Sequence, residues 1–251
     1  MIKAVLFDFN ETLIRSPAWM SLETRSMPSE AFNLLAAQGH ILPLDPERQA
    51  HAQNIFRQAR ETANAAGRET THLDDLNAMV TALGLQFQVP QNLVEQTVAT
   101  LHRQCLPKVN IIDGTVETLA KLDSQNYRIG IISNAAYSPF LTWTLEHFEL
   151  LHFFENIVVS ADVGVRKPSL EIFRIALEQF DLAPIDVVYV GDDFQKDIVA
   201  AKRFGTRAIW FRPEGTPPLS GERAAADAIV SELTQIPTWV DQWNSGTAPE
   251  E

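Results

Sequence analysis

The sequence predicts an α/β fold, in which a three-layer, Rossmann-like core of parallel strands carries an inserted α-helical subdomain. From residue 108 onward, short apolar runs alternate with amphipathic segments, which is the pattern of a parallel sheet covered by helices on both faces. Between residues 16 and 107 there is no strand-like run, and Ala, Gln, Arg and Leu are abundant. A chain of 251 residues is long enough to bury both parts.

The first predicted strand, residues 4–7, is a short apolar run that ends at Asp8. Such a run is typical of a strand buried on both faces of a parallel sheet. The helical stretch follows it almost at once and is therefore an insertion after the first strand. We expect three parts: an α/β core from residues 1–15 and 108–243, a helical cap at 16–107, and a disordered tail at 244–251.

Glycine and proline positions divide the two regions into elements. The inserted stretch contains four predicted helices, near residues 17–38, 46–66, 72–84 and 90–105. The alternating region contains predicted strands at 128–132, 156–159, 187–190, 207–211 and 228–230. Helices are predicted at 115–124, after Pro139, at 170–180, at 198–204, and in a last segment that reaches Trp243.

Composition excludes several classes of partner. The formal net charge of -12 argues against nucleic acid and against an anionic membrane surface. The one cysteine, Cys105, excludes an internal disulfide and a cysteine metal site. The N-terminal stretch carries Asp8 within its first ten residues and has neither a cleavage pattern nor a membrane span. A cytoplasmic protein is the simplest expectation.

Polar residues follow four of the predicted strands. In a parallel sheet the carboxyl ends of the strands meet at one edge, so these residues are expected to converge on a single pocket. Seen alone, each motif is more typical of a turn, a helix cap or an exposed lysine. Their order along the chain is what indicates a site: Asp8-Phe9-Asn10, then Ser133-Asn134, then Lys167-Pro168, then Gly191-Asp192-Asp193 with Asp197.

This arrangement suits attack of a carboxylate on phosphorus, which splits hydrolysis into two displacements. Carboxylate and phosphate are both anions, so a hard cation with oxygen ligands, Mg²⁺, is expected between them. Asp8, Asp192 and the backbone carbonyl of Asn10 can bind the ion, while Asp193 or Asp197 can hold its waters. The transferring phosphoryl oxygens would be surrounded by preorganised donors: Ser133-Asn134, Lys167, and the backbone amides of Phe9 and Asn10.

The four motifs, in this order and at these strand ends, resemble the haloacid dehalogenase-like (HAD) hydrolase superfamily, and the insertion lies where helical-cap members carry their cap. The resemblance implies a hydrolase with Asp8 as nucleophile, Ser133 and Lys167 as phosphate-binding residues, Asp192 as metal ligand and Mg²⁺ as cofactor. It also implies a small, anionic substrate. Helical caps pack on one another or stay single, so both a monomer and a homodimer are compatible with it.

The chain departs from the phosphatase pattern at Asn10, where that branch usually has a second aspartate acting as general acid and base. An amide cannot exchange a proton, and loss of such help typically costs about 10²–10⁴-fold in rate. Four alternatives follow: a slow or leaving-group-selective phosphatase, a 2-haloacid dehalogenase-like hydrolase using the same Asp8, a phosphate or metabolite binder without turnover, or an engineered Asn10. The acidic motif at Asp192-Asp193 favours phosphoryl chemistry.

Arginines, histidines and tryptophans elsewhere in the chain are weaker candidates for function. Dehalogenases of this fold use a cap arginine, and the residues that could serve as one here are Arg15, Arg25 and Arg48. Trp239 and Trp243 are expected to anchor the last helix to the core. The arginines at 57, 60 and 68 could meet an anionic substrate, but an amphipathic helix places arginines on its wet face in any case. Surface roles are expected for the histidines at 40, 51, 72 and 102.

Overall fold

The computed structural model describes residues 1–216 and 226–246 and confirms the α/β core. Six parallel strands form one sheet in the order β5-β4-β1-β6-β7-β8. β1 occupies the centre, with β4 and β6 paired to its two sides in register from Ala4 to Phe7. The strands are β1 (Ala4–Phe7), β4 (Arg128–Ser133), β5 (Asn156–Val159), β6 (Val187–Gly191), β7 (Arg207–Phe211) and β8 (Ala228–Val230).

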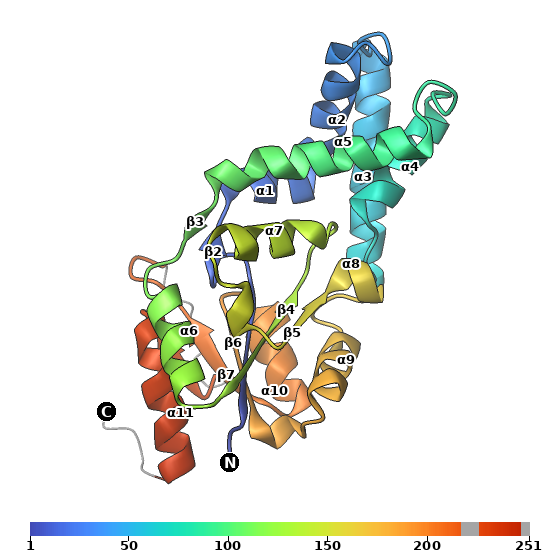
Figure 1. The fold of residues 1–251 in the computed structure, drawn as a ribbon. Coiled ribbons are helices and arrows are strands. Elements are labelled where there is room, and N and C mark those ends of the chain that lie inside the picture. The colour runs from blue at the N-terminus through green and yellow to red at the C-terminus, as the bar shows by residue number, and fades with distance from the viewer. Residues whose placement is uncertain (217–225, 247–251) are drawn as a thin grey trace.

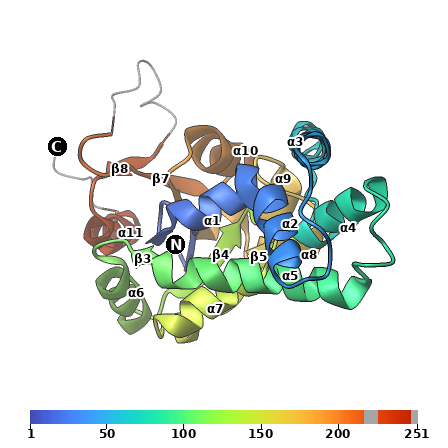
Figure 2. The same cartoon turned by 90° about the horizontal axis from the view of Figure 1, so that it is seen from above.

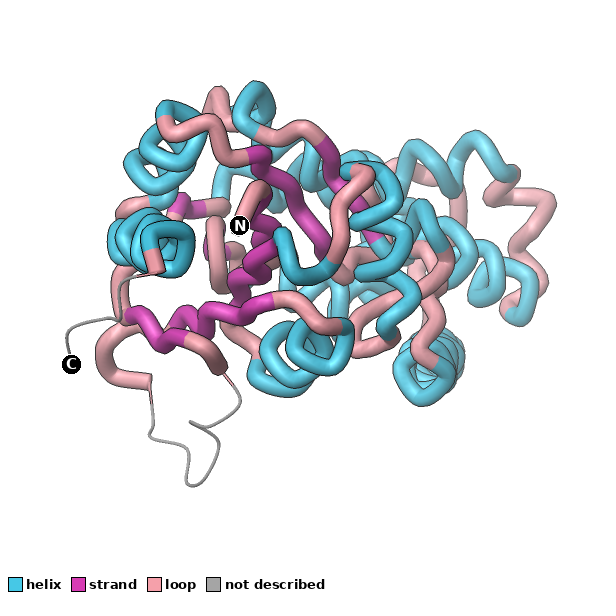
Figure 3. The backbone as a smooth tube through the Cα atoms, turned by 90° about the horizontal axis from the view of Figure 1, so that it is seen from below, coloured by secondary structure: helices cyan, strands magenta, loops and turns pink. Residues whose placement is uncertain are grey.

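Helices cover both faces of this sheet, as Figures 1 and 3 show. One face carries α6 (Thr115–Ser124), α7 (Pro139–His147) and α11 (Ile236–Ser245). The other carries α9 (Leu170–Phe180), η5 (Phe194–Val199) and α10 (Ala200–Phe204). Shorter turns connect them: α8 (Ser160–Val163), η2 (Leu106–Lys108), η3 (Leu151–Phe153), η4 (Pro184–Asp186) and η7 (Leu233–Gln235).

The all-apolar sequence of β1 follows from its central position. Successive side chains of a strand point to opposite faces. Val5 and Phe7 accordingly belong to the apolar cluster that includes α6, whereas Ala4 and Leu6 belong to the cluster that includes α9. None of the four is more than 1% exposed. A polar side chain at any of these four positions would be buried without a hydrogen-bond partner. The first polar side chain after the strand is therefore that of Asp8.

The inserted helices stand above the carboxyl edge of the sheet, at the end to which the parallel strands point (Figure 1). α1 and α5 cross over the strands when the molecule is seen from above (Figure 2). The four predicted helices are all present, the first being interrupted by a π-helical turn. The elements are α1 (Pro17–Ser21), η1 (Leu22–Ser26), α2 (Met27–Ala37), α3 (Pro46–Ala66), α4 (His72–Ala82) and α5 (Gln91–Cys105).

The two connections between insertion and sheet lie side by side. β2 (Ile14–Arg15) and β3 (Asn110–Ile111) form a short antiparallel pair that the sequence analysis did not predict. The Leu13 carbonyl, just before this pair, accepts hydrogen bonds from the Ile112 amide at 3.0 Å and from the Thr115 hydroxyl at 3.0 Å. Two-residue strands carry no detectable periodicity, because pairing with a distant segment is what defines them.

Two helix boundaries differ from the prediction. The helix expected at 198–204 begins earlier, because η5 starts at Phe194 directly after its cap. The last helix continues to Ser245, two residues beyond Trp243, so the expected tail does not start at Asn244. Residues 247–251 of that tail lie outside the described part of the chain. Trp239 and Trp243 pack against the core as expected.

No helix in the described ranges is long and apolar enough to cross a membrane.

Candidate active site

The predicted residues surround a cavity of about 210 Å³ at the carboxyl edge of β1, β4 and β6. Phe9 is the exception. It is fully buried, with its ring 6.0 Å from that of Trp19, and it does not line the cavity. Eight predicted residues line the cavity: Asp8, Asn10, Ser133, Asn134, Lys167, Asp192, Asp193 and Asp197.

Asp8 is the first residue beyond the buried part of β1. Its amide still donates to the Val190 carbonyl at 2.8 Å, so the residue is fixed by the sheet while its side chain lies at the cavity. The chain then folds back, and the amides of Leu13 and Ile14 both donate to the Phe9 carbonyl. Glu11, at the tip of this turn, has a left-handed backbone with a φ of 61°. A non-glycine residue in this conformation is held there by its surroundings.

Lys167 connects Asp8 to the far side of the site. Its Nζ donates to Asp8 Oδ1 at 2.6 Å, to Asp197 Oδ1 at 2.8 Å and to Tyr189 Oη at 2.8 Å. Burial alone would lower the pKa of Lys167, but the carboxylates of Asp197 and Asp8 raise it above its usual range. The ammonium group therefore stays charged. Tyr189 was missed by the sequence analysis, because it lies within the apolar run of β6.

Asn134 holds the backbone of Lys167 with both ends of its side-chain amide. Asn134 Oδ1 accepts from the Lys167 amide at 2.8 Å, and Nδ2 donates to the Lys167 carbonyl at 2.9 Å. The peptide bond between Lys167 and Pro168 is cis. The Asn134 side chain, expected to bind phosphate, thus holds the backbone of Lys167.

Three acidic side chains come together at the cavity. Asp8, Asp192 and Asp197 each offer a carboxylate oxygen, and these atoms all lie within 4.8 Å of one another. Burial, together with the charges of Asp8 and Asp197, raises the pKa of Asp192 to about 8. Crowded carboxylates of this kind are stabilised by a cation, and a donor set made only of oxygen suits a hard ion such as Mg²⁺. The residues present therefore fit the ion that the sequence predicts.

Asp193 and Asp197 are engaged by the protein itself. Asp193 caps η5, accepting from the amides of Gln195 at 3.0 Å and Lys196 at 2.9 Å. Asp197 Oδ2 accepts from the Asp193 amide at 2.9 Å, and its other oxygen binds Lys167. A Cβ at Gly191 would lie 2.5 Å from Asp197 side-chain atoms, so only glycine permits this approach. These contacts place Asp193 as a helix cap and Asp197 as the anchor of Lys167.

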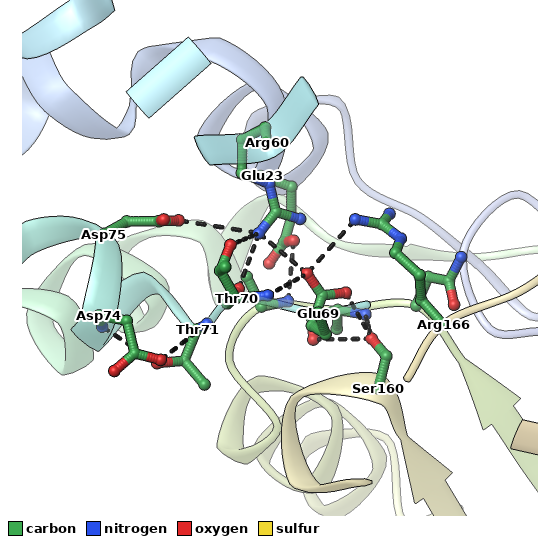
Figure 4. A network of polar contacts seen from close by, with 12 residues as sticks. Glu23, Arg60, Glu69, Thr70, Thr71, Asp74, Asp75, Ser160 and Arg166 are labelled. Carbon is green, nitrogen blue, oxygen red and sulfur yellow. Dashed lines mark hydrogen bonds and ion pairs between the residues drawn. The ribbon is translucent and has the colours of Figure 1, made fainter. Parts of the chain in front are cut away.

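Two arginines form a further part of the cavity wall. Arg60 from α3 and Arg166 both line it, and Glu69 Oε1 lies between them, 2.9 Å from Arg60 Nη1 and 3.3 Å from Arg166 Nη1 (Figure 4). The prediction that Arg60 lies on the wet face of its helix was wrong, because α3 passes beside the cavity and the side chain points inward. Arg57 and Arg68 are exposed. The candidates Arg15, Arg25 and Arg48 are not among the lining residues.

The prediction of surface positions also failed for two histidines. His72 and His102 are 0% and 1% exposed and lie beside Glu23, another wall residue. His40 and His51 are exposed. Each buried histidine lies on the apolar face of its helix, His72 with Leu76 and Met79 on α4 and His102 with Val94 and Val98 on α5. Contact between α4, α5 and η1 buries these faces.

Comparison with known proteins bears on the family to which the chain belongs. The sequence profile of the haloacid dehalogenase-like hydrolases matches residues 5–211. The chain belongs to this family. The matched span of this HAD-like hydrolase contains all the predicted site residues, from Asp8 to Asp197.

Similar proteins extend over most of the chain. A glyceraldehyde 3-phosphate phosphatase of Methanothermobacter thermautotrophicus is 30% identical over 86% of this chain and 88% of its own length. The protein of the same name from Pyrococcus furiosus is 25% identical over 94% and 91%. The crystal structure of a 2-haloacid dehalogenase from Pseudomonas syringae superposes with a TM-score of 0.76 at 24% identity, covering 97% and 100%. This last likeness concerns the fold of HAD-like hydrolases.

Proposed function

We propose that this hydrolase cleaves a small phosphomonoester through an aspartyl-phosphate at Asp8, in a reaction that depends on Mg²⁺. The observation that carries the proposal is the convergence of Asp8, Asp192 and Lys167 on one cavity at the sheet edge. A cluster of carboxylates that fits a cation, beside a buried lysine, suits an anionic phosphate, whereas displacement of a halide from carbon requires no cation. Relatives of similar length named as glyceraldehyde 3-phosphate phosphatases support it.

In this proposal Lys167 fixes the nucleophile. It binds Asp8 Oδ1, which leaves Oδ2 free to attack phosphorus in a defined direction. Lys167 and the Ser133 hydroxyl would stabilise the charge that develops on the phosphoryl oxygens. Asp8, Asp192 and the backbone carbonyl of Asn10 would hold Mg²⁺, which when bound offsets the repulsion between carboxylate and phosphate.

The helical insertion would act as a cap. We propose residues 1–15 and 108–243 as the core and 16–107 as the cap, since β2 and β3 place both connections at one point. Met20, Glu23 and Arg60 of the insertion line the cavity and would exclude water from the reacting atoms. We also propose that the substrate is a small anionic molecule. We propose a cytoplasmic location and a monomeric or homodimeric state.

Asn10 would restrict the leaving groups that the enzyme accepts. The position cannot donate a proton to the departing oxygen, and Asn10 Oδ1 is buried without a hydrogen-bond partner among the described residues. Substrates whose leaving groups are already stable as anions avoid this deficit. We therefore expect aryl phosphates to react faster than alkyl phosphates of similar size.

A second candidate is a 2-haloacid dehalogenase-like hydrolase that uses the same nucleophile. Two observations favour it: Asn10 replaces the general acid, and the guanidinium groups of Arg60 and Arg166 line the cavity, where either can accept a leaving halide or a substrate carboxylate. The carboxylate cluster that includes Asp192 favours the phosphatase, because displacement of a halide requires no cation.

One set of assays separates the two functions. The first assay measures phosphate release from an aryl phosphate and from small alkyl phosphates, with Mg²⁺ present and after a chelator has removed it. The second assay measures halide release from 2-haloacids. Metal-dependent phosphate release that is lost in Asp8→Asn, but kept in Asp123→Asn on the exposed side of α6, supports the phosphatase. Halide release without metal supports the dehalogenase. Full activity of a folded Asp8→Asn protein on either panel would overturn both.

A further inference from the structure

A second cluster of metal-ligating side chains lies outside the acidic site. Glu23 from η1, His72 from α4 and His102 from α5 each offer one ligand atom, and these atoms all lie within 4.8 Å of one another. Glu23 is 7% exposed, and the two histidines are 0% and 1% exposed. Three segments far apart in the sequence thus present two ring nitrogens and one carboxylate oxygen to a common point.

The hydrogen bond made by His102 fixes which of its nitrogens faces the cluster. Its Nδ1 lies 2.9 Å from the Val98 carbonyl, which can only accept, so Nδ1 carries the proton. In the neutral ring the lone pair of Nε2 then faces Glu23 Oε1 at 3.7 Å. Two lone pairs that face each other at this distance repel, unless a cation or a proton lies between them.

Glu23 is held in place as a metal-binding carboxylate would be. Its Oε1 accepts from Trp19 Nε1 at 3.1 Å, and its Oε2 accepts from the Ala136 amide at 3.0 Å. Both oxygens of this carboxyl group are thus oriented by the protein. Arg60 does not compete with a cation for it, because Arg60 Nη1 pairs with Glu69 at 2.9 Å and lies 3.7 Å from Asp75 (Figure 4).

His72 is the member of the cluster whose polar atoms lack hydrogen-bond partners. Neither of its ring nitrogens has a hydrogen-bond partner among the described residues, although the side chain is fully buried. Leaving such a group unpaired is unfavourable, because the buried nitrogens have lost the water that would bind them in the unfolded chain. In its neutral form the ring has one nitrogen with a free lone pair. A neutral buried imidazole of this kind is a ready ligand for a metal ion.

We propose that Glu23, His72 and His102 form a binding site for a divalent cation of borderline softness, of which Zn²⁺ is the first candidate. Two imidazoles and a carboxylate are ligands that Zn²⁺ prefers, whereas Mg²⁺ prefers oxygen alone. Three protein ligands leave a fourth position for water. The contacts of His102 with Val98 and of Glu23 with Trp19 are the outer hydrogen bonds that orient metal ligands.

The ion would join three segments of the insertion close to the sheet. The Ala136 backbone, in the loop after β4, donates to Glu23 and accepts from the His72 amide at 2.9 Å. A cation at this point would therefore brace η1, α4 and α5 directly above the core. Because Glu23 also lines the catalytic cavity, the same ion would fix part of the cavity wall.

The test is a metal titration of the metal-free full-length protein, with excess Mg²⁺ present to occupy the acidic site. We expect one Zn²⁺ per chain, a higher midpoint of thermal unfolding with Zn²⁺ than with Mg²⁺ alone, and visible d–d absorption when Co²⁺ replaces Zn²⁺. These readouts do not depend on catalytic activity, so they stay separate from the phosphatase proposal.

Variants identify the ligands. His72→Phe, which retains an aromatic ring beside Phe56, and His102→Gln should both lose stoichiometric Zn²⁺ binding and the Co²⁺ absorption. Trp19→Phe removes the hydrogen bond to Glu23 and also shrinks a buried ring that stacks on Phe140, and it should weaken binding about 10–100-fold. His51→Gln, at an exposed position of α3, serves as the matched control and should bind as the parent does.

Two results would overturn the proposal. The first is a parent protein that binds no Zn²⁺ in excess Mg²⁺, which would leave Glu23 as the partner of a protonated histidine or of a water. The second is Zn²⁺ binding that persists unchanged in both folded histidine variants. If a variant fails to fold, the parent titration together with Trp19→Phe still decides the matter.

Discussion

The Nζ atom of Lys167 lies 2.6 Å from Oδ1 of Asp8, although 159 residues separate the two in the chain. Both side chains are buried, and Lys167 also binds Asp197. The contact orients the proposed nucleophile and compensates part of the negative charge at the sheet edge. It ties catalysis to stability, because loss of the ammonium group would leave buried carboxylates without their cationic partner.

Removing the lysine ammonium should therefore lower both activity and stability. In Lys167→Met we expect kcat to fall by at least about 100-fold, as for loss of a preorganised donor. Breaking a buried ion pair should also lower the free energy of unfolding by about 3–5 kcal/mol. Steady-state kinetics and denaturant unfolding measure the two effects. Lys121→Met, at an exposed position of α6, is the control; equal behaviour of the two variants would contradict the role of Lys167.

Restoring an acid at position 10 should increase phosphatase activity. Asn10→Asp supplies a group that can protonate the leaving oxygen and then activate water, which is worth up to about 10²–10⁴-fold. The gain should be largest for alkyl phosphates and small for aryl phosphates, and a plot of log kcat against leaving-group pKa should become flatter. An unchanged slope in a well-folded variant would show that position 10 does not handle the proton.

Asn134 should act through Lys167. Asn134→Ala removes both hydrogen bonds to the Lys167 backbone and should lower the free energy of unfolding by about 1–3 kcal/mol, with a fall in kcat as Lys167 loses its position. Asn134→Asp keeps the acceptor for the Lys167 amide and should recover part of both. If the alanine variant changes KM for phosphate esters but leaves kcat intact, Asn134 binds substrate directly.

Asp75 should make stability depend on pH. Burial raises the pKa of this carboxyl from 3.8 to about 7, although the nearby charge of Arg60 acts to lower it. The folded state thus holds the proton more tightly than the unfolded chain, so this stabilisation is complete at low pH and is lost as pH rises through 7. The loss amounts to at most about 4 kcal/mol.

Thermal unfolding of Asp75→Asn tests this. The amide resembles the protonated carboxyl group, so the variant should gain stability over the parent at pH 8 and little at pH 5. Asp74→Asn is not a suitable control, because Asp74 caps α4 with Thr71. The exposed Asp123→Asn is preferable. A difference between Asp75→Asn and the parent that is the same at both pH values would contradict the raised pKa.

The sheet and the ends of its strands could be predicted because local sequence carries them. The apolar run at 4–7 can only be buried, and the first polar residue after it must lie at the sheet edge. The same reasoning located Ser133 and Asp192. Tyr189 could not be found in this way, because its hydroxyl points out of an otherwise apolar strand toward Lys167.

The inserted helices show the opposite case. Their number and approximate bounds followed from glycine and proline positions, yet the predicted surface position was wrong for Arg60, His72 and His102. An amphipathic helix indicates which residues share a face, but not what that face meets. Here the faces meet a polar cavity and a neighbouring carboxylate rather than water.

By itself, then, the sequence determined the parallel sheet, the helical insertion and the set of acidic and basic residues at the strand ends, since burial and periodicity act over a few residues. Only the tertiary structure decided that Asn134 holds Lys167, that Asp197 anchors it, and that Glu23 meets two histidines. Those contacts join segments whose spacing in the chain carries no information about their distance in space.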